Sequence, residues 1–216
     1  MDVQQPFPLL DGIREVMART KEFSSKQPVT IVAIAGGSGA GKTFISRILQ
    51  THLPASIVVS MDSYYRPLAE MPDNNFDTPT ALDLSLLSLH LRMLKEEKTI
   101  QQPVYDMTIS DRVGFAEFHP RSVIILEGMF ALHEAIRDVL DMRVFVETQP
   151  QVRLQRRMKR DIVERKRTKE SVLTQWKELT YPMHQFHVQP QRSCADIIIH
   201  NNETTLLQVL EQDAFL

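Results

Sequence analysis

The sequence of 216 residues contains very little cysteine, and this scarcity restricts the classes of protein it can belong to. Cys194 is the single cysteine, which excludes an internal disulfide framework and a zinc site built from several cysteines. Net charge is also small, because 25 basic residues face 27 acidic ones and leave a formal charge of -2. This near-balance argues against nucleic acid as a partner for the whole domain.

Long hydrophobic runs are absent as well. The longest runs, such as residues 123–126, are far shorter than the roughly 18 residues of a membrane-spanning helix. The N-terminal residues also lack the basic start and unbroken apolar stretch of a signal peptide. We therefore expect a cytoplasmic protein with no membrane partner. Hydrophobic residues at 43% and charged residues at 24% are globular averages, which predicts a single folded domain over residues 1–216.

Short apolar runs rich in β-branched residues alternate with longer helical patterns along the chain. The short runs predict buried strands at residues 29–35, 57–61, 123–126, 144–146 and 197–199. The longer patterns predict helices at residues 9–23, 42–52, 82–97, 130–140, 150–165, 169–186 and 203–215. Such alternation is typical of an α/β protein with three layers, in which a mostly parallel sheet is covered on both faces.

Two regions interrupt this alternation. Residues 100–119 contain two short extended segments, which predict a β-ribbon insertion outside the main sheet. Residues 153–169 contain nine basic side chains against only Asp161 and Glu164. A solvated helix face and a nucleic-acid patch are alternatives, but no aromatic residue lies among these charges. We favour an arginine-rich lid over residues 153–175.

Glycine is scarce too, yet four of the seven glycines fall within six positions. The motif G-x-x-x-x-G-K-[ST] is satisfied by the segment Gly36-Gly37-Ser38-Gly39-Ala40-Gly41-Lys42-Thr43. It lies between a predicted strand and a predicted helix, the context in which backbone N–H groups can surround phosphate oxygens. Lys42 would reach the β and γ phosphates, and the Thr43 hydroxyl would ligate Mg²⁺. Residues 28–52 therefore predict a phosphate-binding unit for ATP or GTP.

Two carboxylates follow predicted strands. Asp62 comes directly after the strand at residues 57–61, and Glu127 comes directly after the strand at residues 123–126. Ligands gather at the carboxyl ends of parallel strands, so both acids should lie beside the phosphate loop. One acid could hold Mg²⁺ while the other accepts a proton from an attacking hydroxyl. The alternative is that either acid only caps a helix.

Seven segments of the chain together resemble the uridine/cytidine kinase and phosphoribulokinase family of P-loop kinases. They are residues 35–43, 60–65, 75–79, 103–106, 124–128, 152–162 and 195–198. The resemblance covers nearly the whole chain. It implies a P-loop NTPase fold, ATP or GTP as phosphate donor, Mg²⁺, a nucleoside acceptor and a homo-oligomer.

The resemblance also implies a role for individual residues. Asp62 would take the proton from the ribose 5′-hydroxyl close to the metal, and Glu127 would join Thr43 around Mg²⁺. Asp77 would accept hydrogen bonds from the ribose 2′- and 3′-hydroxyls. Phe76 would line that pocket. The other implied contacts are Tyr105 on the pyrimidine, Arg157, Arg167 and Gln175 on the nucleoside, and Arg160 and Arg165 on the triphosphate.

The sequence departs from the family at two positions. Ser110 stands where family members that act on uridine or cytidine carry a histidine, and a serine hydroxyl has a shorter reach. Lys166 stands where the family has glycine. The principal hypothesis is phosphoryl transfer to the 5′-hydroxyl of a pyrimidine ribonucleoside. The alternatives are another ribosyl compound or sugar phosphate as acceptor, a non-catalytic nucleotide switch, and a nucleic-acid-binding ATPase.

Three further side chains receive structural interpretations. His184 and His187 are three residues apart, but no third metal ligand is evident, so we expect packing or surface roles for both. Trp176 either packs under the lid or shapes the acceptor pocket.

Overall fold

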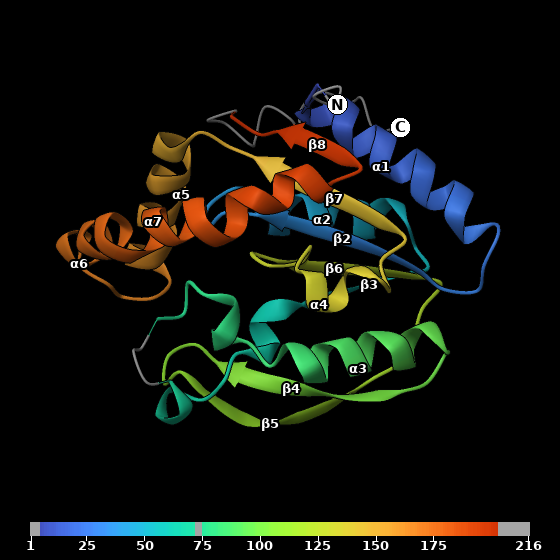
Figure 1. The fold of residues 1–216 in the computed structure, drawn as a ribbon, viewed down its shortest axis with the longest axis horizontal. Coiled ribbons are helices and arrows are strands. Elements are labelled where there is room, and N and C mark those ends of the chain that lie inside the picture. The colour runs from blue at the N-terminus through green and yellow to red at the C-terminus, as the bar shows by residue number, and fades with distance from the viewer. Residues whose placement is uncertain (1–4, 72–74, 203–216) are drawn as a thin grey trace.

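Six strands form one parallel sheet in the computed structural model, which describes residues 5–71 and 75–202 (Figure 1). The order across the sheet is β1-β8-β7-β2-β6-β3, and every neighbouring pair is parallel. The strands are β1 Phe7–Pro8, β2 Thr30–Gly36, β3 Ser56–Ser60, β6 Val123–Gly128, β7 Met142–Glu147 and β8 Ile197–His200. Five of them were predicted; β1, only two residues long, was not.

Side chains of the central strand β2 explain why the sheet needs a layer on each face. Every residue of β2 is buried. Successive side chains point to opposite faces, so Ile31 and Ala33 join one apolar cluster whereas Val32 and Ile34 join the other. Both faces of a parallel sheet are therefore withdrawn from water, as predicted for this class.

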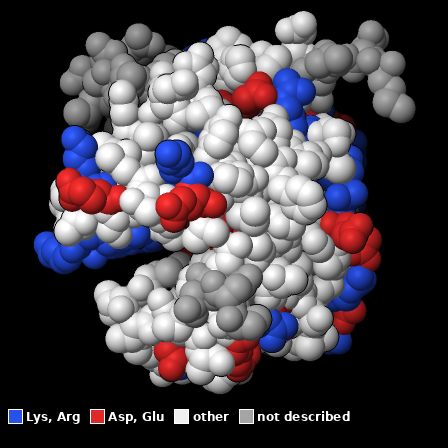
Figure 2. All heavy atoms as spheres, turned by 60° about the vertical axis from the view of Figure 1, so that its left-hand side comes forward, with Lys and Arg blue, Asp and Glu red and all other residues white. Residues whose placement is uncertain are grey.

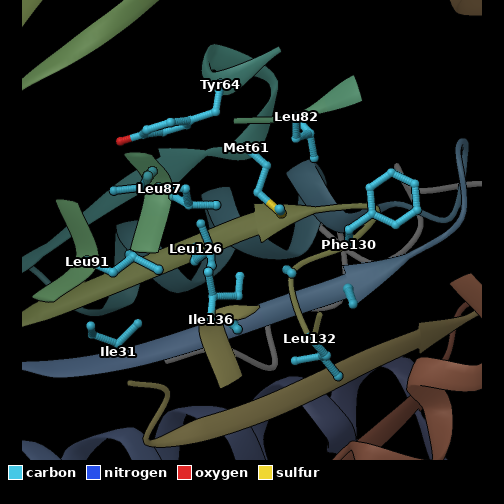
Figure 3. Close-up of a cluster of buried hydrophobic side chains, with 14 of the residues drawn as sticks. Ile31, Met61, Tyr64, Leu82, Leu87, Leu91, Leu126, Phe130, Leu132 and Ile136 are labelled. Atoms are coloured by element: carbon cyan, nitrogen blue, oxygen red, sulfur yellow. The ribbon is translucent and has the colours of Figure 1, made fainter. Parts of the chain in front are cut away.

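Helices supply both layers. On one face α1 Leu9–Ser24 and α2 Lys42–His52 pack against the sheet, and on the other α3 Leu84–Lys95 and the short α4 Glu134–Arg137 do so. Figure 3 shows this second cluster, with Leu87 and Leu91 of α3 facing Leu126 of β6. None of the described helices has the length and apolar character that a membrane crossing requires.

The predicted ribbon is present as β4 Ile100–Asp106 and β5 Asp111–Phe118, an antiparallel pair separate from the main sheet. In Figure 1 it lies beyond α3, on the side away from the six-stranded sheet.

A long helical arm precedes the last strand. After α5 Pro150–Val163, the arm comprises α6 Lys169–Gln175, a π-helical turn Trp176–Thr180, α7 Tyr181–Met183, a second π-helical turn His184–Val188 and a 3-10 helix Gln189–Cys194. Every fourth residue of the arm is buried: Val172, Trp176, Thr180, His184 and Val188. An α-helix has about 3.6 residues per turn, so a spacing of four would drift around its axis, and the wider π turns correct that drift.

Two of the predicted helices need comment. The helix expected at residues 130–140 was wrong in extent, since only Glu134–Arg137 is helical. Phe130, Ala131 and Leu132 are instead a buried turn, and the Leu132 N–H donates to Gln191 Oε1 at 2.9 Å rather than within a helix. The helix expected at residues 203–215 lies outside the described residues.

The helix α3 offers a matched pair for testing this packing. Leu91 is 0% exposed whereas Leu89 is 53% exposed. Leu91→Ala should lower the free energy of unfolding by about 3 kcal/mol, because it leaves a cavity in the core. Leu89→Ala removes the same atoms from a solvated position and should change it by less than about 0.5 kcal/mol. Urea denaturation of both variants checks the difference; equal effects would contradict the assigned faces.

Candidate active site at the phosphate loop

The phosphate loop connects the end of β2 to the start of α2. Gly39 has a φ of 78° and Gly41 a φ of 97°, a left-handed region that residues with a Cβ rarely adopt. Lys42 is the first residue of α2, and its Nζ donates to the carbonyl oxygens of Gly36 and Gly37 at 2.9 and 3.2 Å. The lysine therefore reaches back over the start of the loop. The motif has the strand-to-helix setting that the sequence predicted.

The two predicted acids lie at the carboxyl ends of neighbouring strands, Glu127 within β6 and Asp62 just after β3. Ser60 at the end of β3 pairs with Glu127 of β6, and Asp62 follows two residues later in a 3-10 helix. Ser60 rather than Asp62 caps that helix, because the Asp62 N–H donates to Ser60 Oγ at 3.3 Å. Asp62 is exposed. The alternative that Asp62 serves as a helix cap is thus not observed.

Glu127 contacts the residue that follows the lysine. The Thr43 hydroxyl lies 3.1 and 2.9 Å from the two carboxylate oxygens of Glu127. Burial raises the pKa of Glu127, and the Lys42 ammonium and the Thr43 hydroxyl oppose that rise. Loss of hydration lowers the pKa of Lys42, while the carboxylates of Glu127 and Asp62 counteract it. The two acids and the lysine therefore form one electrostatic group.

A second group of predicted residues surrounds Tyr65. The Tyr65 ring contacts Phe76 edge-on at 5.6 Å between centroids and Tyr105 at 5.7 Å. Asp77 is buried beside them, and its N–H donates to Asn75 Oδ1 at 3.0 Å. Apolar rings next to a buried carboxylate suit an acceptor with a planar ring and hydroxyl groups. Tyr65 was not among the predicted site residues.

The predicted lid arginines converge on a single buried carboxylate. Asp161 is 0% exposed and lies within ion-pair distance of four guanidinium groups. The nitrogen-to-oxygen distances are 3.3 Å for Arg157, 2.8 Å for Arg160, 3.6 Å for Arg165 and 3.9 Å for Arg167. One negative charge against four positive charges leaves a strong local excess. Sequence reasoning noted Asp161 only as a counter-charge.

Arg157 connects this cluster to the phosphate loop. Its Nη1 donates to Ser38 Oγ at 3.1 Å, and its Nη2 donates to Gln175 Oε1 at 2.8 Å. Arg167 Nη1 also donates to Gln175 Oε1. Gln175 therefore joins the two arginines, and Arg157 links this group of three to Ser38 of the phosphate loop.

A deep notch in the molecular surface accompanies this arrangement. Figure 2 brings forward the side of the molecule where α5, α6 and α7 lie, and Lys and Arg side chains gather on the upper lip of the notch. The excess positive charge favours an anionic ligand.

Three residues that contact the phosphate loop or Asp77 were not predicted as site residues. Arg153 is 1% exposed, and its Nε and Nη1 have no hydrogen-bond partner within residues 5–71 and 75–202. Its guanidinium lies 5.2 Å from the centre of the Trp176 ring, and a Cβ on Gly37 would overlap it. His184 is packed against Gly37 as well. Thr180 is the third; its hydroxyl donates to Asp77 Oδ2 at 2.8 Å. Thr180 and His184 share the spacing of four along the arm, whereas Arg153 lies in α5, within the basic run.

Divalent-cation binding depends on oxygen donors at this edge of the sheet. Among the described residues, no group of three or more His, Cys, Asp or Glu side chains is arranged to hold a metal by itself. The Thr43 hydroxyl and the Glu127 carboxylate are adjacent. Glu127 and Asp62 both interact electrostatically with Lys42. Hard oxygen donors in this small number suit Mg²⁺, which keeps waters and substrate phosphates in its coordination shell. The residues present therefore fit a nucleotide-bound Mg²⁺.

The parallel sheet, the phosphate loop after a central strand and the strand-end acids together define a P-loop kinase. The chain belongs to the Phosphoribulokinase / Uridine kinase family, whose model matches residues 31–208. A uridine kinase of Ligilactobacillus salivarius (strain UCC118) is 40% identical over 178 residues, 78% of this chain and 84% of that protein. A uridine kinase of Geobacillus sp. (strain WCH70) is 39% identical over 212 residues, 88% of this chain and 99% of that protein. The predicted family is thus confirmed.

Solved structures show the same fold. A D-glycerate 3-kinase from Cryptococcus neoformans superimposes with a TM-score of 0.63 at 16% identity, covering 83% of this chain and 89% of that one. A protein described as a possible uridine kinase from Bacillus stearothermophilus gives a TM-score of 0.59 at 17% identity, covering 86% and 99%. The predicted three-layer α/β class is confirmed, whereas the roles of individual site residues stay predictions.

The burial of His184 generates a prediction about pH. Burial lowers the pKa of His184 to about 3, and the positive charges of Arg153 and Lys42 contribute to that decrease. A histidine whose pKa is lower in the folded state than in the unfolded state binds more protons when the chain is unfolded. The free energy of unfolding therefore decreases as the pH is lowered below about 6.5. Between pH 6.5 and 5.5 the wild-type protein should lose about 1 kcal/mol more unfolding free energy than His184→Gln.

Denaturant titrations at both pH values measure this difference. His119→Gln is the matched control, because the His119 side chain is 66% exposed. The control should retain the pH dependence of the wild type. A His184→Gln variant with an unaltered pH dependence would contradict the assignment.

Proposed function

We propose that this protein is a nucleoside kinase that transfers the γ-phosphoryl group of ATP or GTP to the 5′-hydroxyl of a pyrimidine ribonucleoside. The observation that carries the proposal is the position of Asp62 and Glu127, on neighbouring strand ends beside Lys42 and the phosphate loop. The likeness to proteins named uridine kinase supports the same acceptor class.

In this proposal the phosphate loop, residues 36–43, holds the triphosphate. Lys42 neutralises the β and γ phosphates after giving up its bonds to loop carbonyls. Thr43, Glu127 and Asp62 hold Mg²⁺, which supplies charge neutralisation at the phosphates when it is bound.

The acceptor occupies the pocket formed by Phe76, Asp77 and Tyr105. Asp77 accepts hydrogen bonds from the ribose diol, and the two rings contact the base and sugar. Asp62 accepts the 5′-hydroxyl proton. A bond then forms between the 5′-oxygen and the γ-phosphorus while the bond from that phosphorus to the β–γ bridging oxygen breaks, releasing ADP or GDP.

Arg160 and Arg165 contact the triphosphate in the closed lid, whereas Arg157, Arg167 and Gln175 contact the nucleoside. The charge excess around Asp161 supports this part of the proposal, because negative charge on the transferring phosphoryl group would complete the neutralisation. A lid that closes on the triphosphate also excludes water from the γ-phosphoryl group.

Ser110 favours a second candidate acceptor. Burial raises the pKa of the Tyr105 phenol, and the nearby Ser110 side chain partly opposes that rise. The Tyr105 hydroxyl also lies 3.4 Å from the Arg66 carbonyl oxygen. Ser110 has a shorter reach than the histidine of family members that act on uridine or cytidine, so another ribosyl compound is the alternative acceptor.

The proposal treats residues 1–216 as one kinase domain, with the unit at 28–52, the ribbon at 100–119 and the lid at 153–175. Its partners are small molecules, with a homo-oligomer as the expected assembly and no nucleic acid.

An acceptor panel tests the function directly. With ATP and Mg²⁺, uridine or cytidine should stimulate ADP release, whereas 5′-deoxyuridine should not, because it lacks the hydroxyl that is phosphorylated. Adenosine, nicotinamide riboside and ribulose 5-phosphate distinguish the alternative acceptor, and an acceptor-free reaction is the control. ADP release with none of these acceptors would contradict the kinase assignment.

The base assignment has its own test. Asp62→Asn should lower kcat about a hundredfold or more, because the amide cannot accept the proton, while ATP affinity changes little. Asp138→Asn, at a side chain that is 59% exposed, is the control and should keep wild-type turnover. Steady-state kinetics decide the matter; a near-normal kcat for Asp62→Asn would remove this residue from the mechanism.

A further inference from the structure

Thr180 is a buried hydroxyl whose partner is the proposed sugar-binding carboxylate. Its side chain is 2% exposed, and Oγ1 donates to Asp77 Oδ2 at 2.8 Å. Asp77 is itself only 7% exposed. The two residues are 103 positions apart in the sequence, so this bond joins the helical arm to the acceptor pocket.

The backbone around Thr180 is built to place this hydroxyl. Thr180 ends the π-helical turn that begins at Trp176, and the Tyr181 N–H donates to the Trp176 carbonyl five residues back. An α-helical continuation would rotate Thr180 away from the buried stripe, because a π turn contains one more residue than an α turn. Such turns are rare in proteins, and those that occur are often found at functional sites.

The first residue of this π-helical turn, Trp176, packs toward the phosphate loop. Trp176 is 8% exposed, and its ring covers the Arg153 guanidinium that packs on Gly37 of the phosphate loop. Fixed at both ends, the turn has little freedom to move Thr180. The hydroxyl is therefore held in one orientation toward Asp77.

We propose that Thr180 is a positioning residue for the acceptor: it fixes the plane of the Asp77 carboxylate so that the two vicinal hydroxyls of a ribose can donate to it together. This inference rests on the proposed function. A carboxylate accepts two adjacent hydroxyls well only in one plane, whereas a single hydroxyl can be accepted over a wide range of angles. Thr180 thereby contributes to the preference for ribose over 2′-deoxyribose.

The variant Thr180→Val tests this, because valine keeps the shape of threonine and removes the hydroxyl. The KM for uridine should rise about tenfold, while kcat at saturating uridine and the KM for ATP stay within about twofold. The ratio of kcat/KM for uridine to that for 2′-deoxyuridine should fall. Thr180→Ser, which keeps the hydroxyl, should restore wild-type values. Thr51→Val makes the same chemical change at an exposed position near the end of α2 and should have no effect.

A double-variant cycle separates positioning from a general loss of structure. In an Asp77→Asn background, Thr180→Val should add no further increase in the uridine KM, because the carboxylate it positions is absent. Trp176 is the single tryptophan, so its fluorescence reports uridine binding independently of turnover.

The outcomes distinguish the inference from the function it rests on. An active wild type with an unchanged uridine KM in Thr180→Val would overturn the inference alone. A tenfold loss of uridine affinity in Thr180→Val that serine does not restore would overturn it too. A wild type that turns over none of the acceptors overturns the proposed function, and fluorescence titration of uridine then tests the positioning role directly.

Discussion

The Ala40 carbonyl oxygen is the fixed point of the phosphate loop. It accepts hydrogen bonds from Asn201 at 2.8 Å, Thr148 at 3.1 Å and Arg156 at 3.4 Å, side chains more than a hundred positions away in the sequence. Because a trans peptide directs its N–H opposite to its C=O, these donors also fix the direction of the Gly41 N–H. The geometry of the loop therefore depends on the sheet, α5 and the segment after β8 together.

Charge is nearly balanced over the whole chain but concentrated locally around Asp161. A protein with a formal charge of -2 gathers four arginines around Asp161. A fully buried carboxylate can hold these side chains together, but it neutralises only a quarter of their charge. The remainder favours an anionic ligand such as a triphosphate, since mutual repulsion among the arginines falls when further negative charge arrives.

The helical arm brings the two halves of the site into one unit. Its buried stripe contacts the phosphate loop through His184 and through the Trp176–Arg153 contact, and it contacts the proposed acceptor pocket through the bond from Thr180 to Asp77. A stripe with a spacing of four requires the two π turns, so the unusual backbone follows from what the arm has to contact on both sides.

The sequence by itself determined the alternation of strands and helices, the phosphate loop and the strand-end acids, because these depend on local periodicity and on residues adjacent in the chain. It predicted a helix at 130–140 wrongly, since the apolar pattern there reflects burial and the Leu132 N–H is satisfied by Gln191 instead. Only the tertiary structure decided that Asp161 gathers the arginines and that Thr180 meets Asp77. Both depend on contacts set by packing and by π turns, for which no local propensity provides a signal.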